Sequence, residues 1–478
     1  MGTPGRSTPA VLEASDPLGP PARTVDRAVV RAASTPAARR GAGGWRQAVE
    51  TVSLPEVHAS IPVVQGGRWW RRLLAFTGPG YLVAVGYMDP GNWATDLAGG
   101  AVYNYALLSV VLLSSVLAMF LQALAAKLGI VAERDLAQAC HDAYPRPVVV
   151  ALWLSAEVAI VAYDIAEVLG AAITLNLLFH LPLVWGVALT ALDVLVVLAL
   201  QHKGFRLIEA FVMVLIATMT VIFGIELALA RPAWGDTVRG LVPTARIVRD
   251  PAMLYLALCI VGATVMPHNL YLHSSVIQLR AYGRSVGARR DALRWAYVDS
   301  TIALTLACFV NAAILLVAAA TFYRTGHHEV AEIQDAYRLM TPLLGAAVAT
   351  PLFAVALLAS GQNSTLTGTL AGQVVLEGFT RFRLPPWARR LVSRALAIVP
   401  ALAAVAWAGE RGMASLLIFS QVVLSAQLAF VVVPLVQFTT DRAKMGPFVN
   451  GPVTRAVGWG VAAVIAILNA YLVVTALR

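Results

Sequence analysis

The feature that most constrains this chain is a series of apolar runs of about 20 residues, each long enough to cross the hydrocarbon core of a bilayer as an α-helix. Hydrophobic residues make up 59% of the 478 residues and charged residues only 13%. Soluble domains carry about 25% charged residues, so the sequence predicts an all-α polytopic membrane protein. Eleven spans are expected, near residues 73–98, 104–128, 147–178, 183–201, 206–230, 252–280, 294–322, 343–377, 391–408, 412–438 and 455–477.

The basic residues are distributed unevenly along the chain. Residues 1–66 are rich in Ala, Pro, Ser and Arg and lack a hydrophobic period, which predicts a disordered basic cytoplasmic tail ahead of an eleven-span domain at 67–478. Lys and Arg then recur in every second loop, so the positive-inside rule places the N-terminus in the cytoplasm and the C-terminus outside the cell. The net charge of +10 therefore indicates orientation in a cell membrane and not a nucleic-acid partner. A monomer is sufficient for such a fold.

Two of the predicted spans contain a polar interruption with a proline. The first breaks at MDPGN (88–92) and the sixth at MPHN (266–269). Proline lacks a backbone donor and clashes with the preceding turn, so each helix is expected to open there, where protein or water must surround the exposed backbone. Breaks in the first helix of two successive five-span sets predict an inverted repeat, with a binding site at mid-membrane. The repeats cover about 73–230 and 252–438, and an extra helix covers about 455–477.

The residues at the two breaks form a predicted cation site. Asp89 and Asn92 offer oxygen atoms three residues apart, and unwinding frees carbonyls such as those of Gly86 and Ala263. A charged Asp at the centre of a bilayer costs about 2.5 kcal/mol or more unless it is paired or functional. Met266 adds a soft thioether, which transition metals accept, whereas Ca²⁺ and Mg²⁺ prefer oxygen alone. The set therefore favours Mn²⁺, Fe²⁺ and similar ions.

Ionisable residues within the third and sixth spans suggest proton transfer. Glu157, Asp164 and Glu167 share one helical face, because they are spaced by seven and three residues. Three acids on one intramembrane stripe predict a proton relay toward the cytoplasm, with an interhelix salt bridge as the alternative for one of them. Histidine titrates near neutral pH and suits the same role. The further candidates are His268 and His273 for proton transfer, and Arg280 and Arg394 as ionic partners of the acids.

Taken together, these motifs resemble the NRAMP family of proton-coupled divalent metal transporters over nearly all of residues 70–476. The matching segments are GYMDPGNW, EVAIVAYDIAEVLGAAI, LQHKGFRLIEA, MPHNLYLHSS, SGQNSTLTGTLAGQVVLEGF and LIFSQVVLSAQL. The resemblance implies a LeuT-like fold of five plus five spans with an eleventh helix added. It also implies proton-coupled import of Mn²⁺ or Fe²⁺, with Cd²⁺ and Co²⁺ as further ions, by alternating access.

The resemblance further implies roles for individual residues. Metal coordination falls to Asp89, Asn92, Met266, the carbonyl of Ala263 and, in some states, that of Gly86. Gln421 in the tenth span is expected to approach the metal when the outer gate closes. Proton handling falls to Asp89, His268, Asp164, Glu157 and Glu167, with His273, Arg280 and Arg394 along the route.

Other functions fit the sequence less well. A sodium-coupled amino-acid or organic-solute carrier of the same fold is the main alternative, and the sulfur of Met266 counts against it. A membrane-bound metal sensor would need a folded signalling domain in place of the low-complexity tail. An enzyme is not expected, because no nucleophile–base pair or nucleotide loop is present. The scattered Cys140, Cys259 and Cys308 predict no disulfide framework and no zinc or iron–sulfur site. No cofactor is therefore expected; the divalent metal is expected as the substrate and the proton as the coupling ion.

Overall fold

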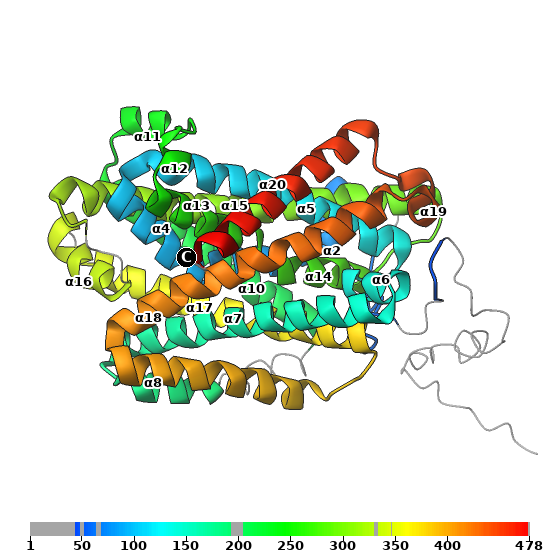
Figure 1. Cartoon of the computed structure of the whole chain (residues 1–478), viewed down its shortest axis with the longest axis horizontal. Coiled ribbons are helices and arrows are strands. Elements are labelled where there is room, and N and C mark those ends of the chain that lie inside the picture. The colour runs from blue at the N-terminus through cyan, green and yellow to red at the C-terminus, as the bar shows by residue number, and fades with distance from the viewer. Residues whose placement is uncertain are drawn as a thin grey trace, which may run out of the picture.

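The computed structural model describes residues 44–47, 52–63, 68–192, 204–328, 333–345 and 347–476. Nearly all of them are helical, and the long helices run alongside one another in one bundle (Figure 1). The two strands in this part of the chain have only two residues each, β1 (Ile61–Pro62) and β2 (Arg280–Ala281), and they pair in parallel. The predicted all-α architecture is therefore confirmed.

The first five-span set begins with a helix that is interrupted at Asp89. Its inner half, on the side expected to face the cytoplasm, is α3 (Pro79–Ala84) with η3 (Val85–Met88), and its outer half is α4 (Pro90–Tyr103). The short α2 (Trp69–Phe76) precedes it. The set continues through η4 (Asn104–Leu107), α5 (Leu108–Ala132), α6 (Leu136–Ala143), α7 (Arg146–Phe179), α8 (Leu183–Leu189), η5 (Thr190–Leu192) and α10 (Phe205–Ala230). Residues 193–201 of the fourth predicted span lie outside the described residues.

The second set repeats this design. Its first helix is interrupted at Met266, between α13 (Pro251–Val265) and α14 (Pro267–Val276). The set continues through η6 (Ile277–Leu279), α15 (Val286–Thr321), α17 (Ala349–Thr380) and α18 (Pro386–Thr440), and α20 (Pro452–Ala476) is the extra helix. Gly409 has non-helical φ 58° and ψ −140°, so α18 consists of two arms, as the predicted boundary between residues 408 and 412 requires (Figure 1). The connecting segments hold α11 (Trp234–Gly240), α12 (Arg246–Arg249), η7 (Tyr323–Thr325), α16 (Ile333–Leu344), α19 (Arg442–Met445) and η8 (Gly446–Phe448).

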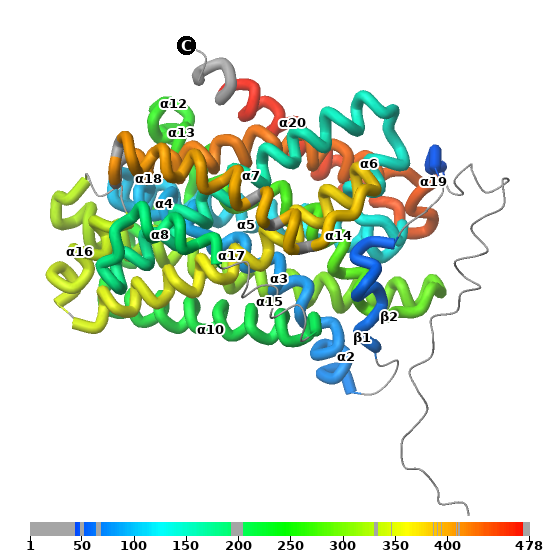
Figure 2. Tube along the Cα trace, turned by 90° about the horizontal axis from the view of Figure 1, so that it is seen from below, coloured from blue at the N-terminus to red at the C-terminus, as the bar shows by residue number. Residues whose placement is uncertain are grey.

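Corresponding helices of the two sets make corresponding contacts. The broken helix of each set contacts the second helix of the other: α4 packs on α15, and α13 and α14 pack on α5. The third helices, α7 and α17, pack on each other, and α20 packs on α18 (Figure 2). This exchange buries both breaks between the sets, as the inverted-repeat prediction requires.

The helices have the length and composition of membrane spans. Eight helical stretches of the described chain are long and apolar enough to cross a bilayer, among them Arg146–Phe179, Phe205–Ala230 and Pro251–Leu279. The long helix α17 is less apolar, because it carries the polar run GQNSTLTGT in its middle. The protein is therefore a multi-pass membrane protein.

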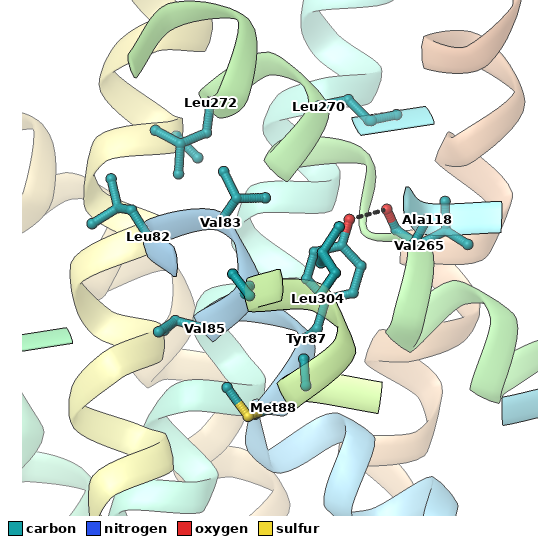
Figure 3. Close-up of a cluster of buried hydrophobic side chains, with 14 of the residues drawn as sticks. Leu82, Val83, Val85, Tyr87, Met88, Ala118, Val265, Leu270, Leu272 and Leu304 are labelled. Carbon is teal, nitrogen blue, oxygen red and sulfur yellow. Dashed lines mark hydrogen bonds between the residues drawn. The ribbon is translucent and has the colours of Figure 1, made fainter. Parts of the chain in front are cut away.

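The interior around the first break is tightly packed. Leu82, Val83 and Val85 of the inner half lie among buried side chains of neighbouring helices that include Leu270 and Leu272 of α14 (Figure 3). The Tyr87 hydroxyl in the same cluster donates a hydrogen bond to the carbonyl of Val265, 3.4 Å away. The inner halves of the two broken helices therefore contact each other directly.

Part of the segment that the sequence predicts to be a disordered tail is ordered on the bundle. Residues 1–43, 48–51 and 64–67 lie outside the described residues, but 44–47 and 52–63 make specific contacts. β1 pairs with β2, and Leu54 and Ile61 belong to the main hydrophobic core. The physical reason is that a few apolar side chains in this polar segment pack against the hydrophobic core of the bundle, which a compositional argument about the segment alone cannot detect.

Candidate metal site

The first break is held open by Asp89. Its backbone is extended, with φ −71° and ψ 165°, and its side chain caps α4 by accepting from the backbone N–H of Asn92 at 2.9 Å. Pro90 follows as the first helical residue, where its missing N–H costs nothing. Asp89 Oδ1 also accepts from Asn92 Nδ2 at 2.6 Å, whereas Oδ2 is buried and has no hydrogen-bond partner among the described residues. One carboxylate oxygen is therefore available for a further ligand.

The second break is centred on Met266. Its φ of 37° and ψ of 99° lie in a region that non-glycine residues rarely adopt, a strain of about 1–3 kcal/mol that is typical of functional sites. Pro267 then starts α14. The Met266 side chain is fully buried against Tyr163 and Leu424, and Asn269 Nδ2 lies 3.5 Å from its sulfur. This backbone conformation therefore directs the thioether of Met266 into the protein interior.

Asn92 connects the two breaks. Its Nδ2 donates to the carbonyl oxygen of Ala263, 2.9 Å away on the last turn of α13, in addition to Asp89. Asn311 of α15 donates to Asn92 Oδ1 at 3.4 Å and to the Tyr87 carbonyl at 2.8 Å. Asn92 thus lies between a carboxylate of the first broken helix and a carbonyl of the second.

Gln421 of α18 lies directly over the first break. A Cβ added to Gly91 would be 1.9 Å from Gln421 Nε2 and 3.0 Å from Asp89 Oδ2, so only glycine leaves room for this amide. Gln421 Nε2 donates to Ser420 Oγ at 2.9 Å, and its Oε1 has no partner in the described part of the chain. Gln421 and the free carboxylate oxygen of Asp89 therefore both border the space beside Gly91.

Gly86 is close to the site, but its carbonyl is engaged. It accepts from the N–H of Asp89 at 3.3 Å and closes the last turn of η3. A Cβ at Gly86 would be 2.2 Å from Asn269 Nδ2, so the absence of a side chain admits Asn269, which reaches the sulfur of Met266.

All of these groups are shielded from solvent. Asp89, Asn92, Ala263, Met266 and Gln421 are each no more than 1% exposed. Within the described residues no three His, Cys, Asp or Glu side chains gather at one point, so a metal here would rely on amide, carbonyl and thioether donors besides the single carboxylate of Asp89. A site with one carboxylate and one sulfur suits transition metals more than Ca²⁺.

The acids of α7 lie beside the site on the inner side. Asp164 and Glu167 are buried, and Arg394 of α18 contacts Glu167 Oε2 at 3.3 Å and the Asp164 carbonyl at 3.5 Å. Gly368 of α17 provides their space, since a Cβ there would lie 2.8 Å from Glu167 Oε1 and 3.2 Å from Asp164 Oδ1. Arg394 therefore forms an ion pair with Glu167, one of the three acids of the stripe.

Glu157 and His268 extend this row in opposite directions. Glu157 pairs with Arg389 at 3.0 Å and accepts from Trp153 at 3.0 Å near the inner end of α7, where it is partly exposed. His268, two residues after Met266, stacks on Tyr163 with ring centroids 4.2 Å apart, and neither ring nitrogen has a partner among the described residues. The Tyr163 ring borders the same space at Gly368 as Asp164 and Glu167, so His268 is connected to these acids through Tyr163.

His273 and Arg280 lie elsewhere. His273 Nδ1 is 2.9 Å from Gln122 Oε1, and Gln122 donates to the Tyr87 hydroxyl at 2.7 Å. Arg280 pairs with Glu209 of α10 at 2.7 Å, both side chains fully buried. The expectation that Arg280 holds an acid of the third span ionised is therefore wrong, because Arg280 lies in β2, beyond η6, where it meets α10 and the end of α2. Its guanidinium also donates to the carbonyls of Ala75, Phe76 and Thr77.

The sequence interpretation missed several neutral polar residues around the breaks. They are Tyr87, Gln122, Asn269, Asn311 and Ser360, whose hydroxyl donates to the Met88 carbonyl at 2.5 Å. The signal that could have found the amides is their position inside otherwise apolar spans, where an uncharged polar side chain requires a partner.

Two discontinuous helices, one from each repeat, whose breaks meet inside the bundle, define a membrane transporter of the inverted-repeat class. The sequence agrees with this class: residues 80–475 match the Nramp family, described as natural resistance-associated macrophage protein-like. The chain therefore belongs to the Nramp family, whose members are transporters and not enzymes.

Individual relatives match over almost their whole length. The chain is 57% identical over 438 residues to the divalent metal cation transporter MntH of Bradyrhizobium diazoefficiens, which covers 91% of this chain and 97% of that protein. It is 57% identical over 428 residues to the protein of the same name from Listeria innocua, covering 90% and 96%.

Solved structures show the same fold. The manganese transporter of Eremococcus coleocola superposes with a TM-score of 0.82 at 41% identity, covering 88% of this chain and 90% of that one. Mhp1, a nucleobase-cation-symport-1 family transporter, gives a TM-score of 0.51 at 14% identity over 83% of this chain and 90% of that one, a likeness of fold alone. The predicted LeuT-like arrangement of five plus five spans with an extra helix is thereby confirmed.

Proposed function

We propose that this protein imports divalent transition-metal ions, Mn²⁺ and Fe²⁺ foremost and Cd²⁺ and Co²⁺ in addition, by alternating access. The observation that carries the proposal is the meeting of Asp89, Asn92, Met266 and Gln421 at the two helix breaks, fully buried. The names of the relatives, divalent metal cation transporter and manganese transporter, support the same substrate class.

The hydrogen bonds of the Asn92 side chain indicate where the cation would bind. Its NH₂ group carries partial positive charge and lies between Asp89 Oδ1 and the Ala263 carbonyl, two of the proposed ligands. Rotation of the amide by half a turn directs Oδ1 to the same place. An entering ion would then exchange two hydrogen bonds for coordination by Asp89, Asn92 and Ala263, with Met266 supplying sulfur. The Gly86 carbonyl joins only if η3 unwinds, since Asp89 N–H now occupies it.

Proton coupling is the second part of the proposal. His268 and Tyr163 lie between Asp89 and the acids Asp164 and Glu167, and Glu157 continues toward the inner surface. A proton that leaves Asp89 on metal binding therefore has a row of acceptors to the cytoplasm, with Arg394 stabilising Glu167 as an anion. Inward movement of positive charge gains about 2.3 kcal/mol per charge per 100 mV of membrane potential. His273 and Arg280 are assigned to gate contacts in place of this route.

The proposed setting is the cell membrane, with the N-terminus in the cytoplasm and the C-terminus outside. The loop charges of the sequence support this orientation. A monomer is sufficient, because both repeats and every proposed ligand belong to one chain.

Metal uptake by purified protein in proteoliposomes tests the proposal. We expect ⁵⁴Mn²⁺ uptake that is suppressed by Fe²⁺ and Cd²⁺ but not by excess Ca²⁺ or Mg²⁺. In Met266→Ala, Ca²⁺ should begin to compete, because the sulfur that favours softer ions is gone. Met253→Ala is the matched control, a methionine that is equally buried in α13 but distant from the break. Absence of Mn²⁺ uptake, or unchanged discrimination in Met266→Ala, would contradict the proposal.

The same uptake assay also tests the alternative function, a sodium-coupled carrier of amino acids or organic solutes. That alternative rests on the shared fold with Mhp1, at an identity of only 14%. It predicts uptake of an organic solute that requires a sodium gradient and ignores Met266. Mn²⁺ uptake in sodium-free buffer would leave it without support.

A further inference from the structure

The segment formed by residues 44–47 and 52–63, here called the N-terminal strap, lies across one end of the bundle. Figure 2 shows it in blue beside α6, α14 and α19, at the end where the inner halves of both broken helices lie. In the orientation proposed above, this end faces the cytoplasm. In the sequence the strap precedes α2 and then α3, the inner half of the first broken helix.

The strap is anchored at its start by Trp45. The indole is only 6% exposed although it precedes every predicted span. The Arg134 guanidinium lies 4.4 Å and the Lys444 ammonium 5.2 Å from its ring, and the ring of Phe438 is 5.5 Å away. An aromatic ring between two cations and a second ring is held by cation–π attraction as well as by burial. Trp45 therefore fixes the strap to the loop before α6 and to the ends of α18 and α19.

A set of charged groups extends this anchor. The Arg46 N–H donates to the Asp142 carbonyl at 3.0 Å, and Arg381, just after α17, donates to Gln47 Oε1 at 2.9 Å. Arg381 and Arg134 both pair with the Asp142 carboxylate, each at 2.8 Å. The start of the strap thus belongs to a network that already joins α6 and α17.

The middle of the strap contacts the inner half of the sixth helix. Ser53 Oγ lies 2.6 Å from Ser275 Oγ of α14, and the Ser53 hydroxyl also hydrogen-bonds the Asp135 carboxylate at the start of α6. A carboxylate only accepts, so Ser53 donates to Asp135 and accepts from Ser275. Ser53 is therefore a direct bridge between α14 and α6.

Backbone contacts continue the attachment beyond Ser53. The Ala59 N–H donates to the Gln278 carbonyl at 3.1 Å, and Ile61 then pairs with Arg280 in the short parallel ladder. Arg280 itself holds the last carbonyls of α2 and pairs with Glu209. The strap thus follows the end of α14 along η6 to the residue that ties it to the first broken helix.

These contacts join parts that an inner opening must separate. In alternating access, the inner halves of the broken helices move relative to the surrounding bundle. We propose that the N-terminal strap is a latch that holds the inner gate closed and that detaches from α14 in each transport cycle. The strap links α14 to α6, α17 and α18, and through Ile61 it pairs with Arg280, which binds the carbonyls at the end of α2 just before α3. Neither inner half can therefore swing out while these contacts persist. This inference depends on the alternating-access function proposed above.

A reversible cross-link tests the latch. Serine hydroxyls 2.6 Å apart place the cysteines of a Ser53→Cys/Ser275→Cys variant within reach of an S–S bond of about 2.05 Å. We expect oxidation to lower ⁵⁴Mn²⁺ uptake by more than about tenfold and a thiol reductant to restore it, because the gate step becomes blocked. Each single variant, oxidised in parallel, controls for Cys140, Cys259 and Cys308, and peptide mass spectrometry confirms the bond. Uptake at the parent rate in fully cross-linked protein would overturn the latch.

A readout independent of transport separates this inference from the proposed function. Hydrogen–deuterium exchange of the full chain in detergent should become faster over residues 267–281 in Trp45→Ala, since the strap loses its anchor. Ser60→Ala, an exposed strap residue, should leave exchange there unchanged. Unchanged exchange in Trp45→Ala would overturn the latch even if Mn²⁺ uptake is established. If the parent protein carries no divalent metal, the proposed function fails, while the exchange result still decides whether the strap holds α14.

Discussion

The side-chain amide of Asn92 lies 2.9 Å from the carbonyl oxygen of Ala263, and this hydrogen bond joins the two broken helices at their breaks. The contact is possible because both helices are interrupted at the same depth and the repeats exchange their packing partners. It places a residue of the first repeat against the freed backbone of the second.

Asn92→Ala should weaken Mn²⁺ binding by about 10–100-fold, the loss expected for one polar ligand to a charged group. Isothermal titration calorimetry on detergent-solubilised protein measures it. Asn469→Ala, which removes a buried asparagine of α20 that contacts Ser425 and the Ala426 carbonyl, is the control and should bind as the parent does. Equal Mn²⁺ affinity in the two variants would remove Asn92 from the site.

Gly91→Ala should lower Mn²⁺ uptake while the protein remains folded. The added Cβ would be 1.9 Å from Gln421 Nε2, so the amide must move away from the site. Gly224→Ala in α10, where a Cβ meets nothing within 4 Å, is the control, and it should be stabilised by about 1 kcal/mol as a helix-interior replacement. Parent-like uptake in Gly91→Ala would show that Gln421 has no part in transport.

Asp164→Asn should uncouple metal from protons. We expect Mn²⁺-driven acidification of proteoliposomes to fall by at least about tenfold, a modest loss for a positioned proton carrier. Mn²⁺ affinity should stay within a factor of about three, because Asp164 is not among the proposed ligands. Glu226→Gln changes a buried acid of α10 outside this row and serves as the control. Acidification at the parent rate in Asp164→Asn would exclude the α7 acids as the route.

The stability of the protein should depend on pH through Asp135. This residue lies in the loop between α5 and α6, and burial raises its pKa to about 7 from 3.8, although hydrogen bonds from Ser53 and from the N–H of Gln138 favour the ionised form. Between these two values the folded protein keeps a proton that the unfolded chain has lost, so this group's contribution to stability falls as pH rises to about 7 and is constant above it.

Asp135→Asn removes that titration but keeps a residue able to cap α6. The melting temperature of the variant relative to the parent should therefore increase between pH 5.5 and pH 8, as scanning fluorimetry can measure. Asp236→Asn, at an exposed carboxylate of α11, should show no such trend. A difference between Asp135→Asn and parent that is constant with pH would refute the assignment.

Much of the site follows from local sequence. MDPGN and MPHN predict both breaks, because proline and glycine act on the backbone within a turn of their own position. The chemistry of Asp89, Asn92 and Met266 then follows from charge and softness. The Gly86 carbonyl is different, since whether it is free depends on the state of η3 and not on residue type.

The ion-pair partners of the buried arginines could not be predicted from local sequence. Arg280 and Arg394 look equivalent in sequence, each an arginine at the edge of an apolar stretch, yet Arg394 contacts Glu167 and Arg280 contacts Glu209. Which acid an arginine meets depends on which helices pack together, a property of distant segments. The N-terminal strap illustrates the same limit, because its polar composition predicts disorder while Trp45 and Ser53 find partners on α18, α14 and α6.

The sequence by itself determined the membrane architecture, the two breaks and the donor atoms at them, since hydropathy, proline geometry and ligand chemistry are local properties. Only the tertiary structure decided that Asn92 reaches Ala263, that Gln421 lies over Gly91, that Arg280 faces α10, and that the strap lies on the inner ends of the helices. Each of these contacts joins residues far apart in the chain, and their proximity arises from the way the two repeats bury their surfaces against each other.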